Sequence, residues 1–560
     1  MINAGAFVGQ FMTAQLRDSV QCFADDCYLL PFVILVGLMA ASTAVFAAGR
    51  SRYTEAPPDN MFVQCVKCIG HALRKRWDKD RKPVEHWLDR AQDRFDGALI
   101  RDVKATLRVL CLFCTFPLFW ALFYQTSTGM IFQAKRLDGL VGSYRIPPEM
   151  SSTVNPLLIL TLIPLFDLVV YPILDRLGVL TKTTSRMIVG MCFAVCAFVV
   201  YAFVNISVEQ VILGPGQARV HFYNALDCPS TVIHPPGMEV EGMVEVPAGG
   251  VHVRDVELGE GVDSVEVVMK AICYSGKEEV RVVLPVEGAH ESTLLLAPSG
   301  PLPLPPTLDY IKDEDAEAKV RVITPDQSIT NLTLKYDTIL QHFTLEANAL
   351  WSPFKRISPQ DYSVLTTTVG DLDSGESIGE ALVRQDGVYD LVVSAEGKDL
   401  SVFPMTPPAQ VHMMWLFPQY LLITIGEVLF SVSGMDFAYS QAPAAMKSTL
   451  QAANLFAITV GLWLFAGLTS IASATKSFEH RASHEAFLYA ALMGLNTLIF
   501  VLLLRWYYRK DSASSSSPSS LSSSPGPSSP AASSEDNKKT EEKGKNEAHL
   551  NPAFVDDHAV

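Results

Sequence analysis

Charged residues are scarce in this chain, making up only 18% of its 560 residues, and the basic ones are the fewer, with 44 Lys and Arg against 59 Asp and Glu. The formal charge of −15 excludes a globally basic nucleic-acid-binding protein. Cysteine is also sparse, because ten residues over this length are too few for a disulfide scaffold. Hydrophobic residues, in contrast, make up 49% of the chain. Their concentration in long uncharged windows excludes a fully soluble protein.

Seven windows of about 20 residues carry almost no charge, and each is long enough to cross a hydrocarbon layer of roughly 30 Å. Within lipid each must be helical, because no other open backbone satisfies its own polar groups there. The opening stretch MINAGAFVGQFMTA has only 14 residues, and we interpret it as the end of an eighth helix rather than a cleaved signal peptide. The seven windows lie at about 28–48, 107–133, 154–175, 185–205, 410–433, 450–472 and 485–507.

The connections between these windows predict the orientation of the chain. Residues 50–106 hold 13 Lys and Arg, so the positive-inside rule places them in the cytoplasm. Counting the crossings from there puts the long segment 206–409 outside and the C-terminus inside. The basic run RWYYRK at 505–510 agrees with that count. We therefore predict a multi-pass membrane protein with a cytoplasmic C-terminus.

The composition of the segment 206–409 fits an outside location, since it holds 31 Asp and Glu against 13 Lys and Arg. Two sequons, at Asn205 (NIS) and Asn331 (NLT), predict glycosylation on a luminal or extracellular face. Four cysteines fall on the same side of the membrane. Either of two pairs could form a disulfide there, and unpaired cysteines are the alternative; the pairs are Cys22 with Cys27 and Cys228 with Cys273.

The outside segment has the pattern of β-strands. Its short β-branched runs, separated by Gly, Pro and Asp turns about ten residues apart, predict two β-sandwich modules on either side of the Pro-rich run SGPLPLPP at 299–306. No nucleophile–base pair and no metal-ligand spacing is visible, so we predict neither an enzyme nor a metal site. The predicted strands are HFYNAL, SVEVVMKAICY, EEVRVVLPV, STLLLAP, AKVRVIT, NLTLKYDTIL and YDLVVSAE.

Two further segments lie on the cytoplasmic side. The run EHWLDRAQDRFDGALIRDV predicts an amphipathic helix that rests against the membrane bundle. Its apolar stripe comprises Trp87, Leu88, Ala91, Phe95 and Leu99. After residue 510 a Ser- and Pro-rich tail begins, whose composition predicts disorder.

Polar residues inside the spans are the strongest indication of function. Glu427 sits in an apolar run, where an unpaired charge costs at least about 2.5 kcal/mol. Tyr420, Thr424, Glu427 and Ser431 follow a helical period and form one polar stripe, which should face a partner helix or a watery cavity. The stripe is either a buried structural network or the site of a carboxylate that receives a substrate ammonium group or a proton.

Two other intramembrane charges need a partner. Arg108 opens the second window and Asp167 lies within the third, so these two side chains could meet across adjacent helices as a static or a gating pair. Trp120 and Asn155 add an aromatic ring and an amide suited to a peptide-sized polar ligand.

The segment GEVLFSVSGMDFAYSQAPAAMKSTLQAANL (426–455) closely resembles the tenth- and eleventh-helix signature of proton-coupled oligopeptide transporters, the POT family of the major facilitator superfamily. The opening INAG is similar to the end of the family's fifth-helix FYxxINxG element. FWALFYQ, TVNPLLIL, IPLFDLVVYP and EHWLDRAQDRFD also resemble family segments, and the large outside region is similar to that of animal di- and tripeptide transporters.

The resemblance implies an all-α membrane protein of the major facilitator fold, truncated at its N-terminus, with an inserted extracellular all-β region of two sandwich-like modules. The implied parts are the end of the fifth and the complete sixth helix (1–49), a cytoplasmic linker with an amphipathic helix (50–106), helices seven to nine (107–205), two β modules (206–305 and 306–409), helices ten to twelve (410–507) and a disordered tail (508–560).

The resemblance also implies roles for individual residues. Glu427 matches the family glutamate that receives the amino terminus of the peptide, Asn3 and Asn155 match pocket amides, and Trp120 matches a pocket tryptophan. Arg108 and Asp167 match a charge pair linked to gating or proton coupling. The coupling ion is the proton, and no cofactor is expected.

The sequence departs from the family pattern in two ways. The first four helices are absent, and with them the ExxER proton-coupling motif and a family histidine. A family tryptophan of the eleventh helix is replaced by Asn454, and an acidic residue of the seventh by Tyr124. We therefore expect an incomplete or inactive form of a peptide carrier, with selectivity altered by the two substitutions.

The leading functional prediction is proton-coupled symport of di- and tripeptides into the cytosol, with peptides, protons and the lipid bilayer as partners and no nucleic acid. One alternative is a transporter of nitrate or of a peptide-like metabolite. Another is a membrane-anchored interaction protein whose acidic β modules bind an extracellular partner.

Overall fold

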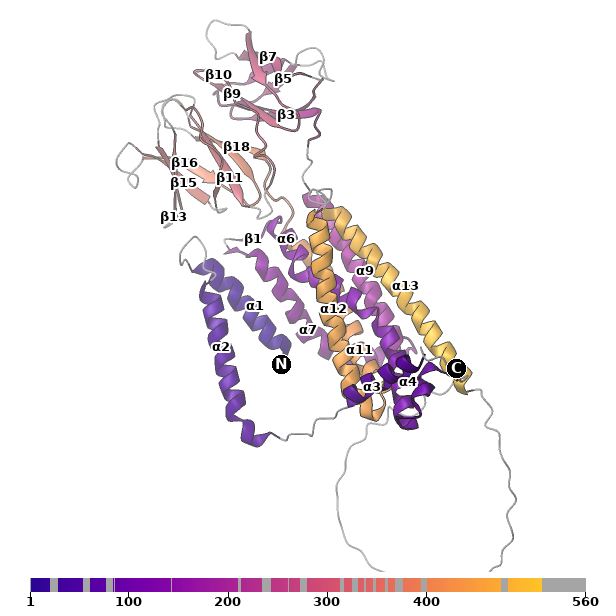
Figure 1. Cartoon of the computed structure of the whole chain (residues 1–560). Helices are drawn as coiled ribbons and strands as arrows, with labels where there is room; N and C mark the ends of the chain where they lie inside the picture. The colour runs from indigo at the N-terminus through magenta and orange to yellow at the C-terminus, as the bar shows by residue number, and fades with distance from the viewer. Residues whose placement is uncertain are drawn as a thin grey trace, which may run out of the picture. The chain divides into compact units, whose positions relative to one another are not determined.

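The computed structural model describes most of the chain from residue 2 to residue 515 (Figure 1). The predictions for Cys22, Cys27 and Cys273 and most of the predicted tail fall outside the described residues. The described residues are 2–20, 29–53, 61–76, 84, 86–142, 144–209, 213–233, 243–259, 261–271, 279–312, 317–324, 331–336, 339–345, 349–357, 361–367, 376–393, 400–474 and 482–515.

Seven helical stretches of the described chain are long and apolar enough to cross a membrane, as the hydropathy of the sequence predicts. Several of them extend beyond the predicted windows, because polar first and last turns continue the helix outside the apolar core. The stretches are Leu29–Ala48, Gly97–Lys135, Pro148–Arg176, Thr183–Val208, Met413–Gln441, Lys447–Ile471 and Ala482–Tyr508.

The α-helices of the described chain form these stretches, in which some are joined by short 3-10 and π turns, and include two further helices, α1 and α3. The α-helices are α1 (Ile2–Ser19), α2 (Leu29–Ala48), α3 (Met61–Arg76), α4 (Gly97–Phe113), α5 (Phe116–Phe123), α6 (Gly129–Lys135), α7 (Val154–Leu165), α8 (Tyr171–Arg176), α9 (Thr183–Val208), α10 (Leu416–Glu427), α11 (Ser433–Gln441), α12 (Lys447–Ala474) and α13 (Ala482–Ser515). The 3-10 turns are η1 (Arg50–Arg52), η2 (Trp87–Ala91), η3 (Tyr124–Ser127), η4 (Pro148–Thr153), η6 (Met413–Trp415) and η8 (Ala444–Met446), and the π turns are η5 (Phe166–Val170) and η7 (Val428–Val432).

The helices pack around one large apolar core rich in aromatic rings. Phe119 and Phe430 stack with their ring centroids 3.9 Å apart, which joins α5 to η7. Phe198 of α9 meets the ring edge of Tyr489 of α13 at 6.0 Å, and Figure 1 shows these two helices running alongside each other. Residues of α4 to α6 and of α9 to α13 share this core, so the bundle is a single packing unit.

Helix α1 confirms that the short opening stretch is helical. It packs against α7, η4 and α2. At its C-terminal end Gln15 donates a hydrogen bond to the Tyr144 hydroxyl at 2.6 Å, and Arg17 forms an ion pair with Glu149. These contacts fix α1 to the start of the span that contains α7.

The predicted amphipathic helix over 85–103 is not continuous. The structure forms η2 and then begins α4 at Gly97 after an extended Asp96. The apolar residues of the stripe nevertheless share one cluster, in which Leu88 and Ala91 are fully buried. The amphipathic helix of this linker is α3, which the sequence analysis missed because its exposed face mixes apolar and basic residues.

The described part of the segment 206–409 forms four sheets of four strands each. Their orders are β10-β9-β3-β6, β5-β4-β7-β8, β14-β11-β17-β18 and β13-β12-β15-β16. A short hairpin of β1 (Leu140–Val141) and β2 (Tyr144–Arg145) precedes them. The strands are β3 (Gln217–Asn224), β4 (Ser230–Ile233), β5 (Met243–Val246), β6 (Val251–Glu257), β7 (Ser264–Ala271), β8 (Val280–Pro285), β9 (Glu291–Ala297), β10 (Gly300–Pro303), β11 (Ala318–Ile323), β12 (Asn331–Tyr336), β13 (Ile339–Thr344), β14 (Lys355–Ile357), β15 (Asp361–Thr367), β16 (Glu376–Leu382), β17 (Val388–Val393) and β18 (Leu400–Thr406).

Each pair of sheets closes over its own apolar core. The first core takes residues from β3 to β9, and the second takes residues from β11 to β18.

Two sequence predictions about the strands are corrected by the structure. The run NLTLKYDTIL is not one strand, because β12 and β13 pair antiparallel with Tyr336 opposite Ile339. Part of the Pro-rich run is the edge strand β10, which tolerates proline because one side of an edge strand needs no N–H donor.

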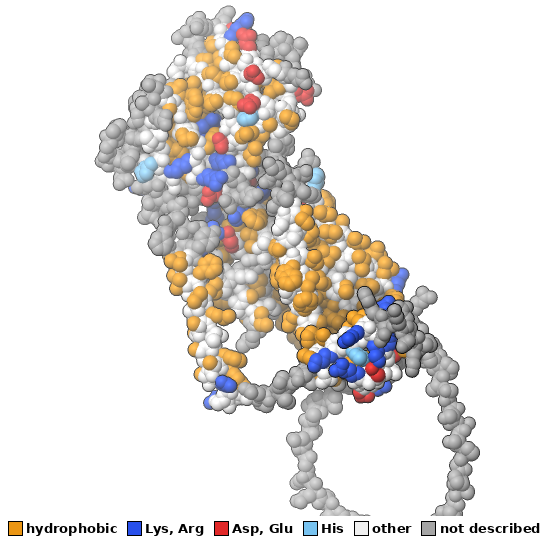
Figure 2. All heavy atoms as spheres, viewed as in Figure 1, with side chains coloured by type: hydrophobic (Ala, Val, Ile, Leu, Met, Phe, Trp, Pro, Cys, Tyr) orange, Lys and Arg blue, Asp and Glu red, His pale blue; other side chains and the backbone are white. Residues whose placement is uncertain are grey.

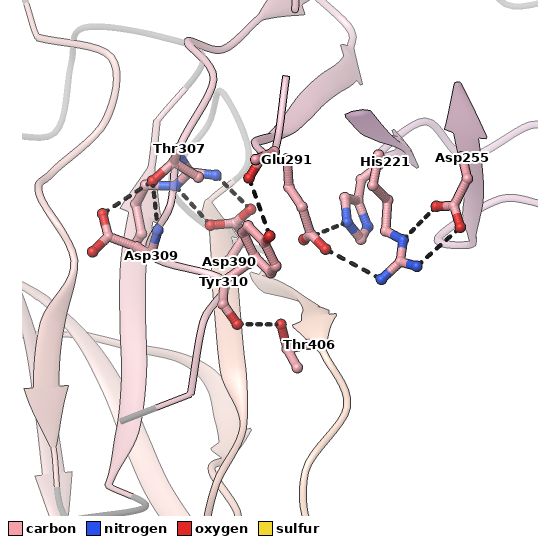
Figure 3. A network of polar contacts seen from close by, with 11 residues as sticks. His221, Asp255, Glu291, Thr307, Asp309, Tyr310, Asp390 and Thr406 are labelled. Carbon is pink, nitrogen blue, oxygen red and sulfur yellow. Dashed lines mark hydrogen bonds and ion pairs between the residues drawn. The ribbon is translucent and has the colours of Figure 1, made fainter. Parts of the chain in front are cut away.

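The two pairs of sheets meet through a third apolar cluster and a set of polar contacts. In the cluster, the ring of Tyr223 on β3 stacks on Phe403 of β18 with the centroids 4.5 Å apart. The segment between the pairs is anchored by Tyr310, which donates to the Ala289 carbonyl at 3.1 Å and accepts at its own carbonyl from Thr406 at 2.9 Å (Figure 3).

Charged side chains flank this joint. Arg219 binds both oxygens of Asp255, at 2.6 and 3.0 Å, and holds the pKa of that carboxyl below its usual range. The ring of His221 lies 2.8 Å from Glu291, and both side chains are buried (Figure 3). Arg321 on β11 forms a buried two-bond pair with Asp390 on β17, with both distances 2.7 Å.

Candidate functional site

The intramembrane carboxylate Glu427 ends α10 and faces the first turn of α7. The side-chain amide of Asn155 donates to Glu427 Oε2 at 2.9 Å and to Thr424 Oγ1 at 3.0 Å. The Thr424 hydroxyl donates its own hydrogen bond to the Tyr420 carbonyl at 2.7 Å. Asn155 and Glu427, two residues assigned to the substrate site from the sequence, are therefore in direct contact.

Tyr420, further along the same stripe, has its hydroxyl fully hydrogen-bonded. Tyr420 is completely buried, and its hydroxyl donates to the Thr126 carbonyl at 3.0 Å. Ser151 lies 3.4 Å from the same hydroxyl and can donate to it. This part of the stripe is a structural network that joins α10 to η3 and η4, as one of the two interpretations of the sequence expected.

Two π turns interrupt the helices next to Glu427. The turn η7 begins directly after Glu427, and η5 contains Asp167. Phe166 of one turn and Leu429 of the other belong to the same apolar cluster. A π turn adds a residue to the helical repeat and is frequent at functional sites. Because of η7, Ser431 does not continue the regular period that the sequence analysis assumed.

A pair of glycines brings α9 and α10 together beside Glu427. A Cβ atom placed on Gly426 would lie 2.7 Å from the Gly190 carbonyl oxygen, and one on Gly190 would lie 2.8 Å from the Gly426 carbonyl oxygen. Both contacts are below any normal Cβ separation. The absence of side chains at these two positions therefore determines how closely α10 approaches α9.

Trp120 lies on α5, buried in the main apolar core. Its indole N–H has no hydrogen-bond partner among the described residues. The ring meets the edges of Phe119 and Phe123, both at 5.6 Å. One turn further along, Tyr124 is within electrostatic range of Glu427.

Asn3 lies in the first turn of α1 and is half-buried. Helix α1 packs against α7, the helix that carries Asn155. The structure therefore places Asn3 on a neighbouring helix of the Asn155–Glu427 pair, and its contact with a ligand stays a prediction.

The structure shows what surrounds Asp167. This exposed residue interacts electrostatically with Tyr171 and Asp436, and Arg186 interacts with the same two groups. The Arg186 guanidinium lies 4.1 Å from the Tyr171 ring centroid. Arg108 is half-buried on α4, a helix that packs against α11 and α12. Its pairing with Asp167 stays a prediction.

Sequence reasoning missed a chain of buried amides elsewhere in the bundle. Gln419 donates to Gln133 Oε1 at 2.7 Å, and Gln133 donates to Asn205 Oδ1 at 2.9 Å. These residues join α10, α6 and α9, and all are at most 3% exposed. Amides in otherwise apolar windows were the signal that could have found them.

The amide chain corrects the glycosylation prediction at Asn205. Its side chain is 2% exposed and bonded within the bundle, so the folded bundle leaves no space for a glycan on this amide. Asn331 begins β12 and stays a prediction. Cys228 is disulfide-bonded, whereas its predicted partner Cys273 is outside the described residues.

Comparison with known proteins places this chain in a family. The family model described as "PTR2: POT family" matches residues 1–232 and 388–485. Solute carrier family 15 member 1 of Canis lupus familiaris is 31% identical over 519 residues, which cover 90% of this chain and 71% of that protein. Peptide transporter family 1 of Drosophila melanogaster is 30% identical over 525 residues, covering 90% of this chain and 67% of its own length.

Other relatives extend further than this chain. Solute carrier family 15 member 2 of Danio rerio is 30% identical over 482 residues, covering 82% of this chain and 64% of that protein. A solved structure of "the POT family transporter PepTSo" gives a TM-score of 0.48 at 16% identity over 91% of this chain and 70% of its own, too low to carry an argument. The family model and the canine relative suffice: the chain belongs to the POT family.

Proposed function

We propose that the protein takes part in the proton-coupled uptake of di- and tripeptides across the plasma membrane into the cytosol. The membership of the POT family and the relative named Peptide transporter family 1 support this proposal. The observation that carries it is the Asn155–Glu427 pair, a carboxylate held by an amide between two membrane-spanning helices.

Glu427 is assigned the role of receiving the peptide ammonium group. Asn155 is bonded to Oε2, which leaves Oε1 as the oxygen assigned to the ligand. A carboxylate in an apolar bundle is costly without a counter-charge. A peptide ammonium group or a proton supplies that charge. Because the two exclude each other at Glu427, symport also requires the coupling proton to bind at a second group, and Asp167 with Arg108 is the candidate for it.

Trp120 and Asn3 are assigned to the walls of the same site. The unpaired indole N–H of Trp120 is a donor suited to a peptide carbonyl or carboxylate. Asn3 supports a polar wall next to α7. Arg108 and Asp167 are assigned to gating or proton coupling, and the π turn around Asp167 gives that helix a point of bending.

The outside region is assigned a separate role. We infer that residues 206–305 and 306–409 form two extracellular sandwich-like modules, supported by the two pairs of sheets that each enclose a core. Glycosylation at Asn331 and a disulfide at Cys228 fit that location. The acidic surface of the modules is proposed to bind an extracellular partner.

The test is uptake of a labelled dipeptide by cells that express the protein, at acidic and at neutral outside pH. Uptake should be greater at acidic pH and should be lost in Glu427→Gln, which keeps an acceptor for Asn155. Glu149→Gln, at the ion pair with Arg17, is the matched control and should retain uptake. Uptake that is unchanged in Glu427→Gln, or that is independent of pH, would refute the proposal.

A measurement of dipeptide binding tests recognition of the peptide separately from its transport. Purified protein should gain thermal stability with dipeptide, by about 2.7 kcal/mol at a concentration 100 times Kd. If the parent protein binds a dipeptide, Glu427→Gln does not, and the parent shows no uptake, Glu427 keeps its role in recognition and the transport part of the proposal is refuted.

A further inference from the structure

Helix α3 connects two membrane-spanning segments without being apolar enough to span itself. One face of it is used for packing, since Cys65, Cys68 and Ala72 are at most 6% exposed. They share a cluster with Ile100 and Val103 of α4, near the beginning of a candidate span. Helix α3 is therefore fixed at the end of the bundle where α4 begins its span, which is the end that the positive-inside rule assigns to the cytoplasm.

A second face of α3 is apolar and exposed. Phe62, Val66 and Leu73 are 63%, 53% and 42% exposed. At about 100° per residue these three side chains lie within roughly 40° of one another and about 100° away from the packed face. A stripe of this kind is unfavourable in water and needs an apolar environment.

Basic residues border the apolar stripe. Lys67, Arg74 and Arg76 are exposed, and no ion pair is found for them among the residues the structure describes. The nearby Asp93 is already held by Lys75 at 2.6 Å. Figure 2 shows Lys and Arg side chains gathered over the end of the helical region where Figure 1 labels α3 and α4.

The apolar stripe of α3 lies beside cations without an ion-pair partner among the described residues, and the helix is held next to a membrane span. This combination fits the surface of a membrane. A helix with such faces lies in the plane of a membrane, with its apolar side at the boundary of the acyl chains. The cytoplasmic leaflet carries anionic lipids that attract Lys and Arg near the surface. A protein partner would have to match both the apolar stripe and the cations, whereas the bilayer is already adjacent on account of α4.

We propose that α3 is an interfacial helix that binds anionic phospholipids of the cytoplasmic leaflet. Phe62, Val66 and Leu73 enter the boundary of the acyl chains. Lys67, Arg74 and Arg76 hold the phosphate and carboxylate groups of the lipid head. The proposal is independent of peptide transport, because none of these residues belongs to the Glu427 site.

The depth of the helix tests the proposal in the full chain reconstituted in lipid nanodiscs. Tryptophan is introduced as Phe62→Trp or, as the matched control, as Gln64→Trp, an exposed position about 200° away on the same turn. After subtraction of the parent signal, phosphatidylcholine brominated on its acyl chains should quench Phe62→Trp at least twice as strongly as Gln64→Trp. Equal quenching of the two variants would overturn the proposal.

The charge requirement is tested separately. Brominated phosphatidylserine should quench Phe62→Trp more strongly than brominated phosphatidylcholine at the same mole fraction. That preference should disappear when Lys67→Gln, Arg74→Gln and Arg76→Gln are added, and it should remain with the control Arg281→Gln on the distant β8. A preference that survives the triple change, or a Phe62→Trp residue shielded from both lipid and aqueous iodide, would overturn it.

Discussion

The close contact of α9 and α10 at Gly190 and Gly426 makes a quantitative prediction about the site. In Gly426→Ala the new Cβ would lie 2.7 Å from the Gly190 carbonyl oxygen and 3.3 Å from the Ala194 backbone nitrogen. Because both neighbours are backbone atoms, no side-chain rotation relieves the contact, and the helices must separate. Overpacking of this kind costs about 1–3 kcal/mol.

The control is Gly494→Ala on α13, where nothing lies within 4 Å of the new Cβ. Both changes gain about 1 kcal/mol of helix propensity, so the control should be neutral or stabilising. Gly426→Ala should therefore be less stable than Gly494→Ala by about 1–3 kcal/mol, measured as thermal unfolding of the purified protein. Dipeptide affinity should fall with it, because Glu427 moves away from Asn155. Equal stability of the two variants would refute the reasoning.

Two further changes test the polar contacts. Gln133→Leu removes the acceptor of the Gln419 amide N–H and the donor to Asn205 Oδ1, and should destabilise the bundle by about 1–3 kcal/mol for each unsatisfied group, seen as earlier thermal unfolding. Unchanged stability would show that these groups find other partners. Arg321→Met leaves a buried carboxylate unpaired and should cost about 3–5 kcal/mol, measured as proteolytic sensitivity of the β region. The control is Arg281→Gln, at the highly exposed ion pair with Glu266, which should change stability by less than about 0.5 kcal/mol. Equal proteolytic sensitivity of Arg321→Met and Arg281→Gln would contradict the role of the buried pair.

Most of the framework was predictable because hydropathy and β-branched periodicity are local signals. The seven windows and the principal strands follow from them. The linker was predicted less well: the stripe from Trp87 to Leu99 suggested one helix, but Asp96 adopts an extended conformation and begins a new one. Helix α3 was missed because its apolar residues are divided between a buried and an exposed face, with basic residues between them, so no single apolar stripe marks the helix.

The candidate site was predictable as a set of residues but not as a geometry. Glu427 is conspicuous as a charge in an apolar run, and the helical period correctly placed Tyr420 and Thr424 near it. Its contact with Asn155 depends on how α7 and α10 pack, which no local pattern encodes. The sequon at Asn205 misled for the same reason, since a three-residue motif carries no information about burial.

Recognition of the amino group of a peptide by Glu427 is tested most directly by N-acetylation of the ligand. The parent protein should bind a dipeptide more tightly than its N-acetyl form, by about 10-fold or more for a hydrogen bond between charged groups. In Glu427→Gln that preference should vanish while the weak affinity for the acetylated peptide is retained. If Glu427→Gln keeps the full preference for the free amino group, the carboxylate does not receive the peptide.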